Sequence, residues 1–176
     1  MPEQPTIYTI GHSNRSADEF IRLLKKFGVD IVADIRRFPT SKFEHFRKEN
    51  LEKILHENGI EYIWFEGLGG YRKKLMVVSP NKSIRSEGFR NYADYMLTDR
   101  FRNEIERLAS TARKNKTCIM CAERFFWRCH RMLISDYLYA VLGFEVVHII
   151  DSENAKRHRI SRHARPADRG LIYDVE

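Results

Sequence analysis

The chain has 176 residues, 43% of them hydrophobic, which suits one globular domain with a sizeable core. It contains no run of about eighteen apolar residues, so we expect no membrane-spanning helix and no membrane partner. Lysine and arginine outnumber aspartate and glutamate by 31 to 24, and the net charge of +7 favours a polyanionic or phosphate-bearing partner.

The three cysteines indicate thiols rather than disulfides. An odd number of cysteines is unusual for a secreted disulfide scaffold, and the opening residues M-P-E-Q-P-T have neither the basic segment nor the apolar stretch of a secretory signal. Reduced cysteines are typical of a reducing compartment, so a cytoplasmic location is expected.

Strands and helices alternate along the chain. Short β-branched or aromatic runs predict five strands, at residues 6–10, 29–35, 60–65, 117–122 and 144–150. Apolar residues at helical period predict one helix between the N-cap Ser16 and Gly28, and others at residues 43–58, 89–97, 100–115 and 131–142. Asp99 is the predicted N-cap of the helix at residues 100–115.

This alternation predicts a single three-layer α/β domain, with a mostly parallel five-stranded sheet and helices on both faces. Residues 1–150 form the domain, and residues 151–176 form a basic C-terminal tail that packs on it or extends from it. The tail is rich in charged and histidine side chains: Lys156, Arg157, His158, Arg159, Arg162, His163, Arg165 and Arg169. It is either a solvated tail or an arm that folds over a ligand or follows a phosphate backbone.

Polar residues follow each of the first four predicted strands. In an open parallel sheet, ligands bind outside the carboxyl ends of the strands, so we expect these groups to converge at one edge. They are His12 and Ser13 after the first strand, Asp34 and Arg36 after the second, residues 67–74 after the third, and residues 121–131 after the fourth. His148, inside the fifth strand, could join them or face the core.

The segment 118–131, C-I-M-C-A-E-R-F-F-W-R-C-H-R, superficially resembles a Cys3His zinc site. Two features count against zinc. Cys118 and Cys121 are an odd number of residues apart on a predicted strand, which sends their side chains to opposite faces. The adjacent Cys129 and His130 are also poorly arranged to bind one tetrahedral ion. A structural zinc domain is therefore the least favoured interpretation, and we expect no metal and no cofactor.

The same segment is more typical of a nucleophile or anion site. A strand, a cysteine and a loop closed by arginine at a helix N-terminus is the layout of cysteine-dependent phosphatases and sulfurtransferases. Here the loop is longer and has no glycine. Cys129 is the best-placed thiol because it directly precedes a helix, and His130 or Arg131 could support its thiolate. Simple packing of a small apolar side chain is the alternative.

Glu123 follows a buried strand directly, where a carboxylate needs a partner or an altered pKa. Arg36, Arg128 and Arg131 are candidate partners. A structural ion pair and a general acid or base both remain open. Trp127, on the same predicted loop, is either core or a platform for a base.

Several motifs spread over the chain resemble one family. They are T-I-G-H-S at residues 9–13, D-I-R-x-x-P at 34–39, L-G-G at 68–70, F-R-N-Y-A-D-Y-M at 89–96 and C-A-E-x-x-x-W-R-C-H-R at 121–131. The chain resembles the family catalogued as domain of unknown function 488. The resemblance implies a compact α/β domain with its site on the 121–131 segment, and it implies no particular reaction. Cys118 lies outside the motif, which favours a core position.

Together these patterns favour an enzyme that acts on a nucleotide, a nucleic acid or another phosphate-bearing substrate, through a pocket at the carboxyl edge of the sheet. The expected catalytic residues are Glu123, Cys129 and His12. The expected substrate- or anion-binding residues are Ser13, Asp34, Arg36, Cys121, His130 and Arg131. The alternative is a non-catalytic DNA- or RNA-binding module that uses the basic tail and loops. The sequence makes no prediction of oligomeric state.

Overall fold

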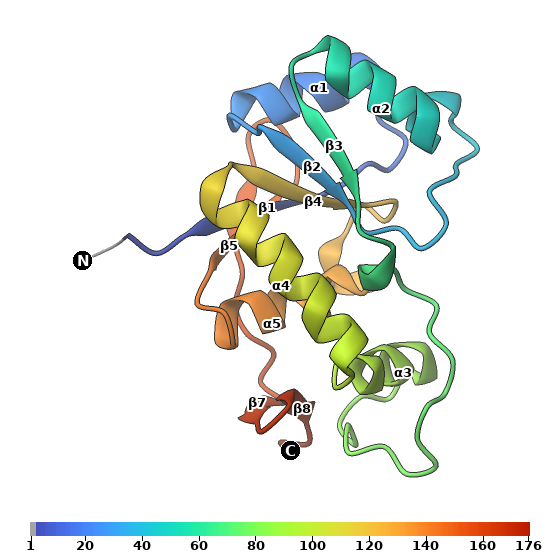
Figure 1. The fold of residues 1–176 in the computed structure, drawn as a ribbon, viewed down its shortest axis with the longest axis vertical. Helices are drawn as coiled ribbons and strands as arrows, with labels where there is room; N and C mark the ends of the chain where they lie inside the picture. The colour runs from blue at the N-terminus through green and yellow to red at the C-terminus, as the bar shows by residue number, and fades with distance from the viewer. Residues whose placement is uncertain (1–2) are drawn as a thin grey trace.

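The computed structural model describes residues 3–176 and has a six-stranded sheet at its centre (Figure 1). The strands are β1 Thr6–Gly11, β2 Ile31–Asp34, β3 Glu61–Trp64, β4 Thr117–Cys121, β5 Glu145–Ile149 and β6 Ala155–Arg157. Their order in the sheet is β3-β2-β4-β1-β5-β6, and all pairings are parallel except β5 with β6. The predicted α/β class and mostly parallel sheet are confirmed.

The predicted number of strands in this sheet was wrong by one. The sixth strand, β6, lies inside the basic tail and reads A-K-R, with all three residues exposed. It therefore has neither the apolar alternation nor the β-branched residues that indicate a strand in a sequence. It pairs antiparallel with β5 at the sheet edge, so its existence depends on a partner strand that is already in place.

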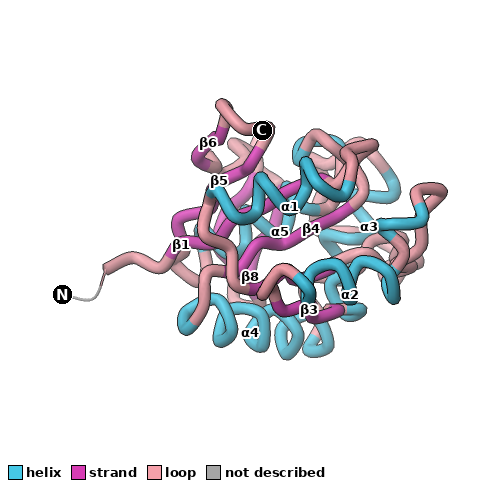
Figure 2. Tube along the Cα trace, turned by 90° about the horizontal axis from the view of Figure 1, so that it is seen from above, coloured by secondary structure: helices cyan, strands magenta, loops and turns pink. Residues whose placement is uncertain are grey.

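Helices cover both faces of the sheet. The α-helices are α1 Ala17–Lys26, α2 Lys48–Glu57, α3 Glu87–Tyr95, α4 Asp99–Lys114 and α5 Arg131–Ala140, with short 3-10 turns η1 Glu44–Phe46, η2 Glu66–Leu68 and η3 Phe126–Arg128. One apolar cluster joins the sheet to α1 and α2, and a second joins its other face to α3, α4 and α5. Figure 2 shows the strands between α1 on one side and α4 on the other. The three predicted layers are present.

Helix starts follow their caps. Ser16 caps α1, and its side chain accepts from the backbone N–H of Glu19, as predicted. The prediction for α4 was off by one residue, because Thr98 rather than Asp99 is the cap and its side chain accepts from the N–H of Phe101. The single helix predicted at residues 43–58 is divided into η1 and α2 around an extended Arg47.

The basic tail folds back onto the domain. After β6, strands β7 Ala164–Ala167 and β8 Gly170–Tyr173 form an antiparallel ribbon, and Tyr173 is buried in the same cluster as α3, α4 and α5. The backbone of Tyr173 donates to the Asn81 side chain at 2.9 Å and accepts from the N–H of Ser83 at 2.9 Å. Two arginines of the tail form ion pairs, Arg157 with Glu145 and Arg165 with Asp174.

The topology determines where a ligand can bind. β1 and β4 lie side by side near the middle of the sheet, and their connections leave in opposite directions: β1 leads through α1 to β2, whereas β4 leads through α5 to β5. Such a divergence opens a crevice outside the carboxyl ends of the strands. None of the helices within residues 3–176 has the length and apolar content of a membrane span.

Candidate active site

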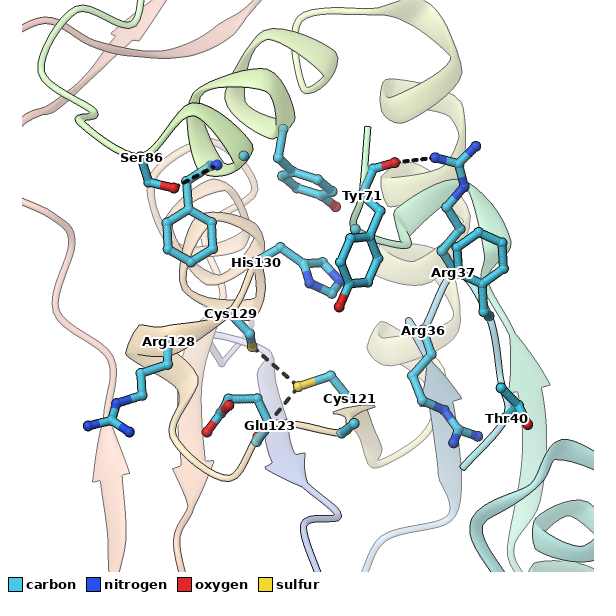
Figure 3. A pocket seen from close by; sticks show the side chains of 16 residues that line it. Arg36, Arg37, Thr40, Tyr71, Ser86, Cys121, Glu123, Arg128, Cys129 and His130 are labelled. Atoms are coloured by element: carbon cyan, nitrogen blue, oxygen red, sulfur yellow. Dashed lines mark hydrogen bonds between the residues drawn. The ribbon is translucent and has the colours of Figure 1, made fainter. Parts of the chain in front are cut away.

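A pocket of about 770 Å³ opens at the carboxyl edge of the sheet, outside β2 and β4 (Figure 3). Three of the predicted convergent segments contribute to it: the residues after β2, Gly70 and Tyr71 after η2, and the segment after β4. It is lined by Arg36, Arg37, Phe38, Thr40, Gly70, Tyr71, Ser86, Gly88, Phe89, Tyr92, Cys121, Ala122, Glu123, Arg128, Cys129 and His130. Its volume lies within the usual range for a small-molecule site.

Two thiols meet in the pocket wall. Cys121 is the last residue of β4, Cys129 directly precedes α5, and their Sγ atoms lie 3.2 Å apart. Cys118 belongs to the opposite apolar cluster, against α1 and α2, so the expected division of the strand cysteines between two faces is observed. Within residues 3–176, no group of three or more histidine, cysteine or acidic side chains is placed to bind a metal ion.

The environment of Cys129 favours its thiolate. The hydrogen bond from the Cys121 thiol is the largest factor that lowers its pKa, and the positive charge of Arg131 acts in the same direction; the resulting pKa is about 6. The backbone N–H and the Nε–H of Arg131 both donate to the Cys129 sulfur at 3.4 Å. The sulfur thus accepts from an N–H in the first turn of α5, where the helix dipole also favours an anion. Burial raises the pKa of Cys121.

Arg131 holds the loop in place from beneath. Its side chain is 1% exposed, and its Nη2 donates to the backbone carbonyls of Glu123 at 2.7 Å and Arg124 at 3.2 Å. Its Nη1 donates to the hydroxyl of Thr9 at 3.2 Å. The guanidinium is therefore not part of the pocket surface, and it acts on the pocket through its charge and through Cys129.

Gly11 makes the tight packing of this loop possible. A Cβ at this position would lie 1.8 Å from the carbonyl oxygen of Glu123, far inside van der Waals contact. The glycine of the T-I-G-H-S motif thus leaves room for the backbone of residues 123–124 to pass over the end of β1. Sequence reasoning did not identify this requirement, because the clash involves a segment more than a hundred residues away.

Asp34 and Arg36 form a buried pair rather than an open clamp. The carboxylate of Asp34 accepts from Arg36 Nε at 2.9 Å and Arg36 Nη2 at 2.7 Å, and from the Tyr62 hydroxyl at 2.5 Å. The remaining Arg36 nitrogen, Nη1, donates to the carbonyl of Phe46 at 2.7 Å. All three side-chain nitrogens of Arg36 are thus engaged with protein atoms, and the pair fixes the course of the chain after β2.

His130 lines the pocket as a neutral imidazole. Burial lowers its pKa to about 4, and its Nε2 donates to the carbonyl of Ile35 at 3.0 Å. This leaves Nδ1 unprotonated and facing Gly70, where a Cβ would lie 3.2 Å from it. Gly70 therefore gives the imidazole space at the pocket wall, and Figure 3 shows the ring between Cys129 and Tyr71.

His12 and Ser13 lie at the same sheet edge but do not line this pocket. Their backbone N–H groups donate to the carbonyls of Cys121 at 2.8 Å and Ala122 at 3.1 Å. The His12 ring stacks on Phe46 at 4.1 Å between centroids, and burial lowers its pKa to about 4. Its Nε2 has no hydrogen-bond partner among the described residues. The structure brings both residues to the end of β4, with their side chains outside the pocket surface.

Glu123 lines the pocket beside the two thiols. Its side chain is half-buried, and its carboxylate accepts from the N–H of Phe125 at 3.3 Å. Within residues 3–176, no arginine or lysine nitrogen lies within 4.0 Å of it, so none of the three predicted arginine partners forms the ion pair. Its carboxylate therefore lines the pocket without a basic side-chain partner among these residues.

The comparisons with known proteins identify the family. The model of a domain of unknown function, DUF488, matches residues 16–138, which is more than half of the chain. The chain belongs to the DUF488 family. No curated protein and no solved structure matches it. The matched range contains β2, β4, Glu123 and both pocket thiols of this DUF488 protein.

The entrance of this pocket is formed by aromatic and cationic residues that were not assigned from the sequence. Tyr71 is 85% exposed and Phe38 is 63% exposed, with 6.4 Å between their ring centroids. Arg37 lies next to both: its guanidinium is 5.6 Å from the Phe38 ring centre, and its Nη1 donates to the carbonyl of Tyr71. The run Arg37-Phe38-Pro39 directly after the D-I-R motif was the available signal. Large exposed aromatics beside a cation suit a planar, anionic ligand.

His148, the candidate from the fifth strand, belongs to a buried polar chain behind the site. It accepts from the Thr9 hydroxyl at 2.6 Å and donates through Nε2 to His158 at 2.9 Å. His158 in turn donates to the carboxylate of Asp136 at 2.7 Å. Because Arg131 donates to Thr9, the chain has one consistent set of tautomers. It connects the tail residue His158 to the arginine that holds the Cys129 loop.

Proposed function

We propose that this DUF488 protein is an enzyme in which the Cys129 thiolate attacks a phosphate-bearing, nucleotide-like substrate bound at the carboxyl edge of the sheet. The observation that carries the proposal is the position of the Cys129 sulfur. It lines the pocket, it accepts two N–H bonds from Arg131, and it lies at the start of α5. A thiolate held in this way is an effective nucleophile at neutral pH.

The charges around the pocket support an anionic substrate. Arg37 and Arg128 line it with their side chains, and the Arg131 guanidinium lies directly behind the sulfur. Arg36 adds positive charge, although Asp34 offsets it. We infer that the exposed arginines contact the phosphate group, whereas Arg36 and Arg131 position the walls of the site.

The aromatic residues support a planar substrate group. Phe38 and Tyr71 are the exposed pair at the pocket entrance. Phe89 and Tyr92 also line the pocket, and the buried Tyr92 ring lies 5.1 Å from that of His130. The wide, mostly apolar pocket suits a base better than a phosphate alone. A nucleotide is the substrate class that combines both requirements.

In this mechanism Cys129 forms a bond to the electrophilic atom of the substrate as the bond to the leaving group breaks. The departing oxygen takes its proton from water. Glu123 lies in the same pocket wall as Cys129. Its carboxylate then accepts a proton from the water that releases the product and restores the thiolate. His12 acts at a distance, through the backbone hydrogen bond that positions the end of β4.

Intact-protein mass spectrometry with a panel of nucleoside mono-, di- and triphosphates tests the proposal. Wild-type protein should form a covalent adduct on Cys129 or turn over one of the nucleotides. Cys129→Ser should lose the activity by about a hundredfold or more, and Glu123→Gln should reduce it by about a hundredfold. Cys118→Ser is the matched control, because this thiol is buried on the opposite face of the sheet, and it should keep full activity.

One outcome would favour the alternative, a nucleic-acid-binding module. In that case Cys129→Ser and Glu123→Gln would bind DNA or RNA as tightly as wild type, and binding would weaken steeply with salt. Deleting the tail is not an informative variant, since Tyr173 and His158 are buried in the domain. The double substitution Arg159→Glu with Arg162→Glu reverses the charge of two exposed tail residues and tests whether the tail binds nucleic acid.

A further inference from the structure

We propose that Cys121 and Cys129 form a peroxide-sensitive pair, in which Cys129 is the residue oxidised first and Cys121 closes it into an intramolecular disulfide. The two sulfurs are 3.2 Å apart, so a disulfide bond requires them to approach by about 1.2 Å. The two cysteines form an oxidative modification site within the pocket, and their oxidation requires no bound substrate. It shares Cys129 with the proposed function, and its chemistry can be measured separately.

The two thiols differ in the way that this chemistry needs. Cys129 is partly exposed and lines the pocket, whereas Cys121 is 3% exposed at the end of β4. The low pKa of Cys129 keeps it ionised at neutral pH, and the raised pKa of Cys121 keeps that thiol protonated. A hydroperoxide that enters the pocket therefore meets one reactive thiolate, with a neutral thiol in contact behind it.

The steps balance without a bound cofactor. The Cys129 thiolate attacks the distal oxygen of a hydroperoxide, an S–O bond forms, the O–O bond breaks, and the leaving alkoxide or hydroxide takes a proton from water. The Cys121 sulfur then attacks the sulfenic sulfur of Cys129. Its thiol proton leaves with the hydroxyl as water, and the S–S bond forms. A dithiol reductant restores both thiols by exchange.

The backbone holds the two cysteines in different ways, Cys121 in the sheet and Cys129 between a short turn and a helix. Cys121 is fixed by its parallel pairing with Gly11 and by the hydrogen bond from His12 N–H to its carbonyl. Cys129 directly follows the short turn η3, and its backbone N–H donates a hydrogen bond to the carbonyl of Phe126 at 3.3 Å. We infer that the small approach is made on the Cys129 side.

Oxidation changes the electrostatics beneath the loop. The disulfide removes the negative charge that Arg131 contacts at 3.4 Å, and leaves its buried guanidinium with carbonyl and hydroxyl acceptors only. A buried charge without a counter-charge is destabilising, so the oxidised loop should pack less tightly against Arg131. The disulfide also consumes the proposed nucleophile, so the proposed activity should stop when the pair is oxidised. Reduction of the disulfide by a dithiol should restore it.

The test is treatment of the full chain with hydrogen peroxide, followed by intact and peptide mass spectrometry. Wild-type protein should lose the mass of two hydrogen atoms, and the linked peptides should contain Cys121 and Cys129. Labelling of Cys129 by iodoacetamide should fall by at least about tenfold and recover after dithiothreitol. Cys118→Ser should behave as wild type.

In Cys121→Ser, Cys129 should instead be trapped by dimedone as the sulfenic acid, and prolonged treatment should add two or three oxygen atoms. If this substitution unfolds the protein, Cys121→Ala provides a second variant. Direct overoxidation of Cys129 in wild type, at the rate seen without Cys121, would overturn the proposal. So would a wild-type protein that peroxide leaves unchanged. Neither result depends on a substrate, so failure of the proposed enzyme activity would leave this test intact.

Discussion

The Nε–H of the buried Arg131 points at the sulfur of Cys129, at 3.4 Å. The same guanidinium binds the carbonyls of Glu123 and Arg124, so one side chain both fixes the loop and stabilises a thiolate. Within residues 3–176, it forms no ion pair with a carboxylate. The sulfur is thus the acidic group in contact with this charge, and loop geometry and thiol reactivity are coupled through it.

The alkylation rate of Cys129 should follow the titration of a thiol whose pKa is about 6. Because the thiolate is the reactive form, the rate should rise through about pH 6 and be nearly constant above pH 7. Iodoacetamide labelling with peptide mass spectrometry measures it. Cys121→Ala should move the midpoint upward, since the Cys121 hydrogen bond is the largest cause of the lowered pKa. Cys118→Ala should leave it unchanged, and a wild-type midpoint near that of free cysteine would contradict this assignment.

Arg131→Gln should destabilise the domain by about 2–4 kcal/mol, because it removes three hydrogen bonds to buried or partly buried acceptors and the charge beside Cys129. Urea denaturation measures the loss, and the labelling midpoint of Cys129 should rise in the same variant. Arg128→Gln is the matched control on the same loop. Its side chain is exposed, so its effect on stability should stay within about 0.5 kcal/mol. Equal stability of the two variants would contradict the structural role of Arg131.

Gly11→Ala should destabilise by about 3 kcal/mol or more, because its Cβ would meet the Glu123 carbonyl oxygen at 1.8 Å and backbone cannot yield easily. Gly88→Ala is the control. It lies in α3, its Cβ would have only the Ser86 hydroxyl within 4.0 Å, and alanine favours a helix by about 1 kcal/mol over glycine. Thermal or urea unfolding of both variants should give shifts of opposite sign, and a well-tolerated Gly11→Ala would indicate a looser loop.

Three histidines should make the protein sensitive to mild acid. Burial lowers the pKa of His12 and His130 to about 4 and that of His148 to about 2, from an ordinary value of 6.5. Below pH 6.5 the unfolded chain binds protons that the folded chain does not, so stability is complete above this pH and falls as pH decreases toward the folded pKa values. Each histidine contributes about 1.4 kcal/mol per pH unit in that window.

Urea denaturation at pH 7 and pH 5 measures this loss. His12→Gln should reduce the pH slope by about a third, because one of the three groups no longer titrates. Stability that stays constant between pH 7 and pH 5 would show that these imidazoles are not buried in their neutral form.

The stability of the buried hydrogen-bond network behind the site should depend on Asp136 more than on any other acceptor in it. Its buried carboxylate accepts from His158 at 2.7 Å, from the Tyr173 hydroxyl at 2.9 Å and from the Ser161 N–H at 3.1 Å. Asp136→Ala should therefore cost about 3 kcal/mol or more, whereas Tyr173→Phe removes one hydrogen bond and should cost about 1 kcal/mol. Urea denaturation of both variants compares their losses of unfolding free energy. Similar losses would show that the hydrogen-bond network is not centred on Asp136.

Much of the fold was predictable, because its signals are local. The strand at residues 117–122 is a continuous apolar run, the Ser16 cap has its Glu19 three residues later, and the alternation of elements indicates a parallel sheet. Strand β6 was missed, since its exposed A-K-R sequence becomes a strand only through pairing with β5. The opposite faces of Cys118 and Cys121 followed from strand geometry alone, and the structure confirms them.

The meeting of these segments at one edge of the sheet was predictable, whereas the contacts among them were not. The sequence by itself determined that residues 34–36, 67–74 and 121–131 lie at one edge of the sheet. Each segment follows a strand, and parallel strands place their carboxyl ends together. Only the tertiary structure decided that Arg131 turns beneath the loop, and that Cys129 rather than a histidine meets Cys121. Those contacts join segments far apart in the chain, and side-chain packing, which carries no local sequence signal, selects among the possible partners.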